Sequence, residues 1–227
     1  MHWLILLSII IVVVAGPQWW VKRTLSRYDK PRPDLPGNGA ELATHLIKQL
    51  SLTQVTLGCD AVSDHYSPLD KQVCLTRKVA DGQSLTAVVV AAHEVGHAIQ
   101  DQQGYRPLRL RTQIARLCIG LEQASAYLLI AIPLAMLLTR TPQSGLFMLV
   151  LAIGSVLAGV GLNLITLPLE FDASFGRALP LLETGGYLSE ADLPAAKKIL
   201  IACALTYVAA SLISLVNAWR WLRLARR

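Results

Sequence analysis

The chain has 227 residues, 53% of them hydrophobic, and its mean hydropathy of +0.46 is too high for an ordinary soluble domain of this size. Its formal net charge of +6 is also found in nucleic-acid-binding proteins. The basic residues cluster beside apolar segments, however, where membrane orientation and anionic lipid headgroups explain them better. The composition therefore predicts a mostly α-helical membrane protein whose partner is a lipid bilayer and not a nucleic acid.

Residues 3–21 form the first long apolar segment, and their length matches the about 20 helical residues that cross a hydrocarbon core. A cleaved signal peptide is the alternative, with Ala15 near the cleavage site. No basic residue precedes the segment, and it continues through Trp19 and Trp20, which are typical of a membrane interface. We therefore predict a retained transmembrane anchor over residues 1–22, followed by a linker over 23–38.

Residues 39–116 are predicted to form a small α-β-β-α unit. Its expected elements are a helix over 40–50 capped by Asn38, strands over 53–57 and 72–79, a polar loop over 58–69, and a helix over 84–103 closed by Gly104. So short a unit has a small core of its own, and we expect it to rest on the membrane helices.

Three further apolar segments are long enough to cross a membrane. They lie at residues 117–138, 146–167 and 199–219. This pattern predicts two transmembrane helices within 117–169, a connection over 170–198, and a transmembrane helix with a basic tail over 199–227. The basic residues beside these segments place the 39–116 unit in the cytoplasm, although the arginine-rich tail opposes that orientation.

A short run within the predicted 84–103 helix reads His-Glu-Val-Gly-His, the arrangement found in zinc-dependent peptidases. His93 and His97 lie one helical turn apart, so they can bind one metal ion together. Glu94 projects beside them and could act as a general base on a metal-bound water. Gly96 costs helix stability, which indicates close approach by another element that the sequence does not identify. A chance occurrence of the pattern is the alternative, but its helical context favours one Zn²⁺ ion per chain.

A catalytic zinc ion needs a third protein ligand. Glu170 follows the third apolar segment, where an ionised carboxylate at the membrane edge needs a partner such as zinc. Its alternatives are exposure at the interface or a pair with Arg177, while His65 in the polar loop is a competing ligand. Asp172 and Ser174 follow on the same predicted helix, where either could orient a ligating histidine or simply cap the helix.

A donor to the developing oxyanion would assist hydrolysis. The candidates are His65, Tyr66, Tyr105 and Arg177, each with packing or a salt bridge as its alternative role. The predicted strand over 72–79 could also bind an extended substrate along its edge, or could serve as a structural hairpin.

Four blocks of the sequence together resemble the small bacterial membrane zinc metallopeptidases of the YugP type. The blocks are Ser-Asp-His-Tyr-Ser-Pro (63–68), Ala-Ala-His-Glu-Val-Gly-His-Ala-Ile-Gln-Asp (91–101), Leu-Pro-Leu-Glu-Phe-Asp-Ala-Ser (167–174) and Ala-Leu-Thr-Tyr-Val-Ala-Ala (204–210). The resemblance implies that His93, His97 and Glu170 bind zinc and that Glu94 is the catalytic glutamate, as in the broader gluzincin group. Those relatives usually carry an acidic residue where this chain has Ser174.

We therefore expect four transmembrane helices and a zincin-like catalytic unit, in a metallopeptidase of the bacterial inner membrane. It would hydrolyse peptide or membrane-protein substrates near the membrane surface, as an endopeptidase, through metal-activated water and Glu94. A noncatalytic membrane adaptor that keeps a structural zinc ion is one alternative. A metal-dependent hydrolase of a nonpeptide bond is the other, and the sequence predicts no oligomeric state.

Overall fold

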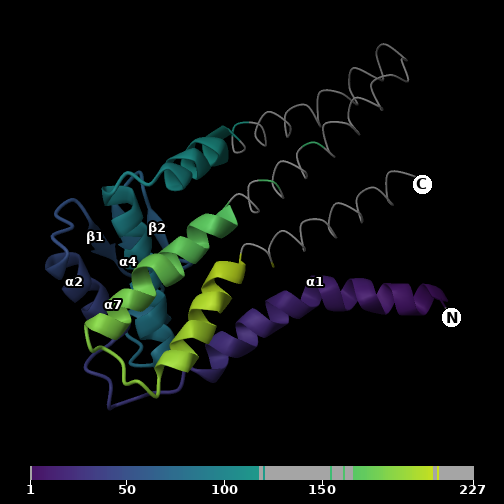
Figure 1. The fold of residues 1–227 in the computed structure, drawn as a ribbon, viewed down its shortest axis with the longest axis horizontal. Coiled ribbons are helices and arrows are strands. Elements are labelled where there is room, and N and C mark those ends of the chain that lie inside the picture. Colours follow the sequence, from purple (N-terminus) through teal and green to yellow (C-terminus); the bar gives the residue numbers. More distant parts are fainter. Residues whose placement is uncertain are drawn as a thin grey trace, which may run out of the picture.

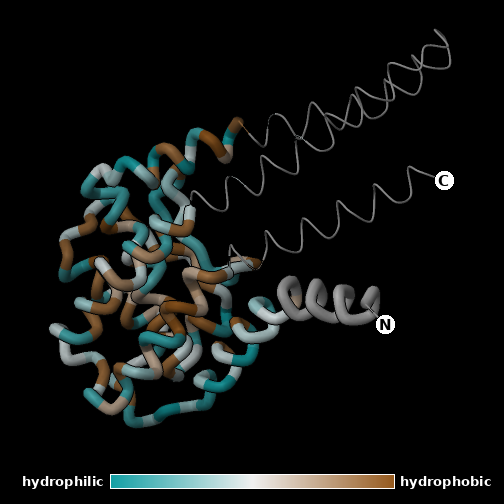
Figure 2. Tube along the Cα trace, turned by 45° about the vertical axis from the view of Figure 1, so that its right-hand side comes forward, coloured by the Kyte–Doolittle hydropathy of each residue, from teal (hydrophilic) through white to brown (hydrophobic). Residues whose placement is uncertain are grey.

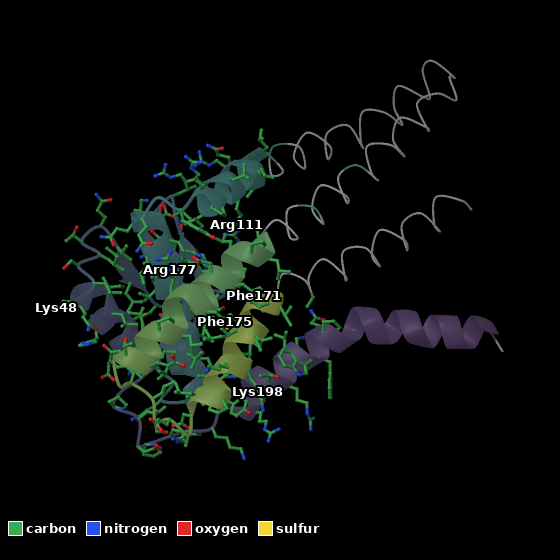
Figure 3. The ribbon with its side chains drawn as sticks, viewed as in Figure 1. Lys48, Arg111, Phe171, Phe175, Arg177 and Lys198 are labelled. Atoms are coloured by element: carbon green, nitrogen blue, oxygen red, sulfur yellow. The ribbon has the colours of Figure 1, made fainter. Side chains whose placement is uncertain are left out.

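The structure is a computed structural model that describes residues 2–117 and 166–206 and the single residues 120, 154, 161 and 209, with side chains from residue 15 onward. This part of the chain is mostly helical and contains one small sheet. Its helices gather around a central helix, α4, and α1 runs away from this body toward the N-terminus (Figure 1). Lys48 and Lys198 point outward from the body (Figure 3).

Helix α1, His2–Arg27, joins the body through its C-terminal turns. Val21 and Thr24 are buried there, and Thr86 on α4 donates a hydrogen bond of 2.8 Å to the carbonyl of Leu25. The guanidinium group of Arg23 lies over the ring of the exposed Trp19, with 5.2 Å between the guanidinium carbon and the ring centre. The end of α1 is therefore a packed and polar part of the body.

Helix α2, Gly39–Gln49, begins at Asn38 as expected. The Asn38 side chain accepts a hydrogen bond from the Glu41 backbone, and the Glu41 carboxylate accepts one from the Asn38 backbone, both 2.8 Å long. Leu42 and Leu46 are buried in the core that α2 shares with α4. The helix predicted over 40–50 and its cap are therefore confirmed.

The sheet has three short strands in the order β1-β3-β2. They are β1, Thr56–Gly58; β2, His65–Ser67; and β3, Gln72–Cys74. Strand β3 runs parallel to β1 and antiparallel to β2, so its buried Val73 lies between Leu57 and Tyr66.

Two features of this region correct the sequence analysis. Strand β2 lies within the polar segment that was expected to be a loop. The strand predicted over 72–79 ends early, because Thr76 caps the short helix α3, Arg77–Ala80, by accepting a hydrogen bond from the Val79 backbone. The α-β-β-α order is therefore replaced by a three-stranded sheet and an additional helical turn before α4.

Helix α4, Leu85–Gln102, is the centre of the body. Its first turn is capped by Ser84, whose hydroxyl accepts a 3.1 Å hydrogen bond from the Ala87 backbone. Every residue from Leu85 to Gln100 is buried, and Gly104 ends the helical region at φ +65°. The predicted helix over 84–103 is confirmed, and its burial on all sides explains its apolar composition.

The chain continues in a helix over 106–117 and, after the residues outside the description, in a helix over 166–171. This second helix passes directly into the π-helix η1, Asp172–Ala178, and then into α7, Leu179–Thr184. A last helix over 193–206 packs Ile199 and Leu200 into the same core. Hydrophobic residues concentrate inside this assembly, and hydrophilic ones follow its outer loops (Figure 2).

The expectation of four transmembrane helices is wrong for the described residues. Among them, no helix combines the length and the apolar character needed to cross a membrane. At the start of one predicted span, Ile199, Leu200 and Cys203 are buried in the protein core. The predicted spans over 117–138 and 146–167, and the remainder of 199–219, lie almost entirely outside the described residues.

Candidate metal centre

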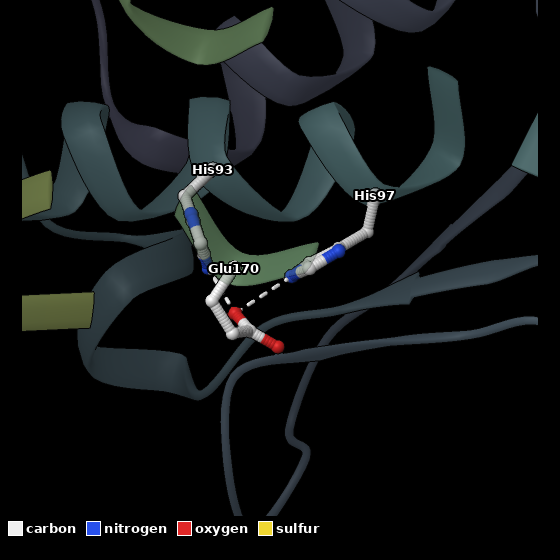
Figure 4. Close-up of side chains that lie close together, drawn as sticks. All are labelled: His93, His97 and Glu170. Carbon is white, nitrogen blue, oxygen red and sulfur yellow. Dashed lines mark hydrogen bonds and ion pairs between the residues drawn. The ribbon is translucent and has the colours of Figure 1, made fainter. Parts of the chain in front are cut away.

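Three side chains from two distant segments meet beside α4. His93 and His97 project from α4, and Glu170 projects toward them from the helix that leads into η1 (Figure 4). The Oε2 atom of Glu170 lies 3.2 Å from Nε2 of His93 and 3.1 Å from Nε2 of His97. Their ligand atoms all lie within 4.8 Å of one another, and among the described residues these three form the one such group able to hold a metal ion.

The chemistry of this group fits zinc. Two imidazole nitrogens and one carboxylate oxygen are a ligand set of catalytic zinc sites. Ligand atoms bound about 2.0–2.1 Å from a tetrahedral ion lie about 3.3 Å apart, close to the two distances to Glu170 Oε2. The second oxygen, Glu170 Oε1, is buried and has no hydrogen-bond partner among the described residues. A bound cation would give this oxygen a partner.

The site is buried and electrostatically coupled. His93, His97 and Glu170 are 3%, 6% and 1% exposed. Burial by itself raises the pKa of Glu170, but the charge and hydrogen bonds of the two histidines outweigh it and hold that pKa below its usual range. Burial lowers the pKa of His97, and the facing carboxylate of Glu170 more than reverses this, so the net pKa is raised. Glu170 therefore stays ionised, as a metal ligand must.

Glu94 lies next to His93 on α4 and is itself buried, at 6% exposure. Burial raises the pKa of Glu94, and the neighbouring carboxylates of Glu170 and Asp64 raise it further, against the opposing effect of the histidines. A carboxylate with a raised pKa takes up a proton more readily than an exposed one. This environment suits a general base.

Ser174 contacts the first histidine. Its hydroxyl oxygen lies 3.1 Å from Nδ1 of His93 and donates a 3.2 Å hydrogen bond to the Leu200 carbonyl. Because the Ser174 hydroxyl hydrogen is directed at the Leu200 carbonyl, the Ser174 oxygen can accept a hydrogen bond from the Nδ1–H group of His93. Ser174 thus makes the contact expected of a residue that orients a ligating histidine and leaves Nε2 available to the metal.

The second histidine contacts Gln100, which the sequence analysis missed. Nδ1 of His97 lies 2.9 Å from Oε1 of Gln100. Asp172 acts one step further away, because its carboxylate accepts a 2.7 Å hydrogen bond from the Gln100 amide and so reaches His97 only through Gln100. The spacing from His97 to Gln100 places both on one helical face, and this signal could have identified Gln100.

Gly96 allows the two segments of the site to approach. A Cβ atom on Gly96 would lie 2.7 Å from the carbonyl oxygen of Ala173 and 3.4 Å from Cβ of Arg177. Helix η1 is therefore the close neighbour that the sequence left unidentified.

The other candidates contact partners outside the three-residue group. His65 is exposed, and its Nδ1 atom lies 2.9 Å from the Ser63 carbonyl. The Tyr66 hydroxyl donates to Asp101 at 2.7 Å, and burial, followed by the Asp101 charge, raises the pKa of Tyr66. Arg177 contacts Asp172 at 3.3 Å and also Gln103. Tyr105 follows the end of α4, where its backbone donates to the Gln100 carbonyl.

The possibility that a substrate pairs with the strand predicted over 72–79 is also corrected. Strand β3 has β1 on one side and β2 on the other, so neither of its edges is free to pair with a substrate.

The chain belongs to a family of zinc metallopeptidases. Residues 3–226 match the family described as "Putative neutral zinc metallopeptidase". The chain is also 33% identical over 216 residues to the "Putative membrane protease YugP" of Bacillus subtilis (strain 168), with 92% of each chain covered. No solved structure matches it. The resemblance seen in the four sequence blocks is therefore confirmed, and the family implies zinc as the metal.

Proposed function

We propose that this protein hydrolyses peptide bonds with one zinc ion held by His93, His97 and Glu170. The observation that carries the proposal is the convergence of these three ligand atoms in a buried site, where Glu170 Oε1 has no protein partner among the described residues. Membership of a zinc metallopeptidase family supports it independently.

Bound zinc would acidify a water molecule and polarise the scissile carbonyl. Glu94 acts as the general base, taking the proton from the attacking water and delivering it to the leaving amine. Its buried position next to His93 favours this role, since burial raises its pKa above the usual value of a glutamate. Ser174 and Gln100 hold the outer nitrogens of the two histidines, so that both inner nitrogens face the same point.

The substrate we propose is a polypeptide cleaved internally, including segments of membrane proteins. The Bacillus relative is named a membrane protease, and on that ground we infer that this chain also works in association with a membrane. The cytoplasmic location of the site stays a prediction.

The experiment compares the full chain with its Glu94→Gln variant. Zinc per chain is measured by atomic emission, and hydrolysis is followed on unfolded casein and on a lipid-reconstituted membrane protein. We expect equal zinc in both proteins and a loss of cleavage of roughly 10²- to 10⁴-fold in the variant. The exposed Glu190→Gln variant is the matched control and should keep full activity.

Two outcomes would reject parts of this proposal. Equal cleavage by the wild-type and Glu94→Gln proteins would remove Glu94 as the base. Full zinc occupancy without cleavage of any polypeptide would favour a structural zinc ion or a nonpeptide substrate.

A further inference from the structure

One buried amide connects the two segments that carry the metal site. Gln100 is fully buried, and its side chain contacts three groups at once. Its oxygen faces Nδ1 of His97 at 2.9 Å, while its nitrogen donates to the Leu169 carbonyl at 3.0 Å and to Asp172 Oδ2 at 2.7 Å. Since Leu169 directly precedes Glu170, this amide spans from one candidate ligand to the backbone beside another.

The orientation of the amide is fixed by its partners. Both acceptors on the nitrogen side, a carbonyl oxygen and a carboxylate oxygen, require hydrogen-bond donors. A flipped amide would place its oxygen against these two oxygens and its nitrogen against His97. The observed orientation therefore presents an acceptor to His97 Nδ1 and leaves Nε2, 3.1 Å from Glu170 Oε2, as the ring nitrogen that would bind a metal ion.

A second layer holds this arrangement. Asp172 Oδ2 also accepts a hydrogen bond from Nε of Arg177 at 3.3 Å, and Arg177 contacts Gln103 at the end of α4. These contacts link Gln100 on α4 to Asp172 and Arg177 on η1, and Arg177 in turn to the end of α4. Only Gln100 in this set is fully buried, so its own hydrogen bonds are the ones most shielded from water.

We propose that Gln100 is a positioning residue that selects the tautomer of His97 and sets its separation from Glu170 before metal arrives. This inference rests on the proposed zinc site. It predicts that both ends of the amide matter: the oxygen for the direction of His97, and the nitrogen for the position of the segment that carries Glu170.

Two substitutions in the full chain separate the two ends. Gln100→Leu removes both, whereas Gln100→Glu keeps an acceptor for His97 but loses the donor to Leu169 and Asp172. We expect zinc affinity, measured by competition with a chromophoric chelator, to fall about 10- to 100-fold in each. The visible absorption of the Co²⁺-loaded protein should change as well, because it reports ligand geometry and not global stability. The exposed Gln102→Leu on the same helix is the control and should match the wild type.

Wild-type zinc affinity and Co²⁺ spectrum in Gln100→Leu would overturn the proposal, and the same result in Gln100→Glu would overturn the role of the nitrogen. If the Gln100 variants fail to fold, Asp172→Ala supplies the test, since its side chain is 26% exposed and anchors the same nitrogen. It should weaken zinc binding in the same direction, and unchanged affinity would contradict the proposal. A wild-type chain that binds no zinc would instead reject the proposed function itself.

Discussion

His97 and Glu170 are 73 positions apart in the chain, yet Nε2 of the histidine and Oε2 of the carboxylate lie 3.1 Å apart in the buried centre of the protein. The two residues belong to different helical segments, so a metal ion at this point would join α4 to the segment that leads into η1.

The Glu170→Gln substitution should abolish tight zinc binding. It preserves the size of the buried side chain but replaces the charged ligand with a neutral amide, so the loss should exceed the about 10- to 100-fold typical of removing an outer hydrogen-bond partner. Equilibrium dialysis against zinc measures it. Glu183→Gln, at a partly exposed carboxylate 3.5 Å from Lys197, should bind zinc normally. Unchanged binding in Glu170→Gln would exclude this residue as a ligand.

Ser174→Ala should weaken zinc binding by about 10- to 100-fold, because His93 loses the acceptor for its Nδ1 proton. The same change removes the hydrogen bond that the Leu200 carbonyl accepts from the Ser174 hydroxyl. Isothermal titration with zinc gives the affinity. Ser189→Ala removes an exposed hydroxyl bound to Asp192 and is the control. A normal zinc affinity for Ser174→Ala would show that His93 needs no such partner.

Gly96→Ala should destabilise the protein even though alanine is the better helix former by about 1 kcal/mol. The new methyl group would meet a backbone carbonyl at 2.7 Å, and overpacking of this kind costs about 1–3 kcal/mol. Urea unfolding and zinc titration should both show a loss, because η1 must move away from α4. Gly16→Ala, where nothing lies within 4 Å of the added carbon, should show neither. A fully stable Gly96→Ala would contradict the close packing.

Removal of zinc by a chelator should loosen the contact between α4 and η1. A ligand present at 100 times its Kd stabilises the folded state by about 2.7 kcal/mol, and this contribution disappears with the metal. Hydrogen exchange followed by mass spectrometry should therefore speed up in Leu85–Gln102 and Asp172–Ala178. The chelator should have no effect on Glu170→Gln protein, and an equal effect on both proteins would argue against the site.

Local signals in the sequence predicted local structure well. Asn38 caps the first turn of α2 as predicted, and Gly104 ends α4 through its own backbone conformation. The relative position of His93 and His97 is also a local feature, because one turn of a helix places both on the same face. These features require no knowledge of the rest of the fold.

Features that depend on distant partners could not be read in the same way. Strand β2 forms by pairing with β3, and the polar composition around His65 does not indicate a strand. The neighbour of Gly96 is Ala173, far along the chain. Ile199, Leu200 and Cys203 pack in the protein core, and hydropathy does not distinguish such burial from contact with lipid. Gln100 is the exception, since its helical spacing from His97 was visible in the sequence.

The most direct test of the central claim is a crystal structure of the full chain loaded with zinc, with anomalous data collected at the zinc edge. We expect one strong anomalous peak about 2.0–2.2 Å from Nε2 of His93, Nε2 of His97 and a carboxylate oxygen of Glu170. A peak coordinated by His65 in place of Glu170, or no peak between α4 and η1, would contradict it.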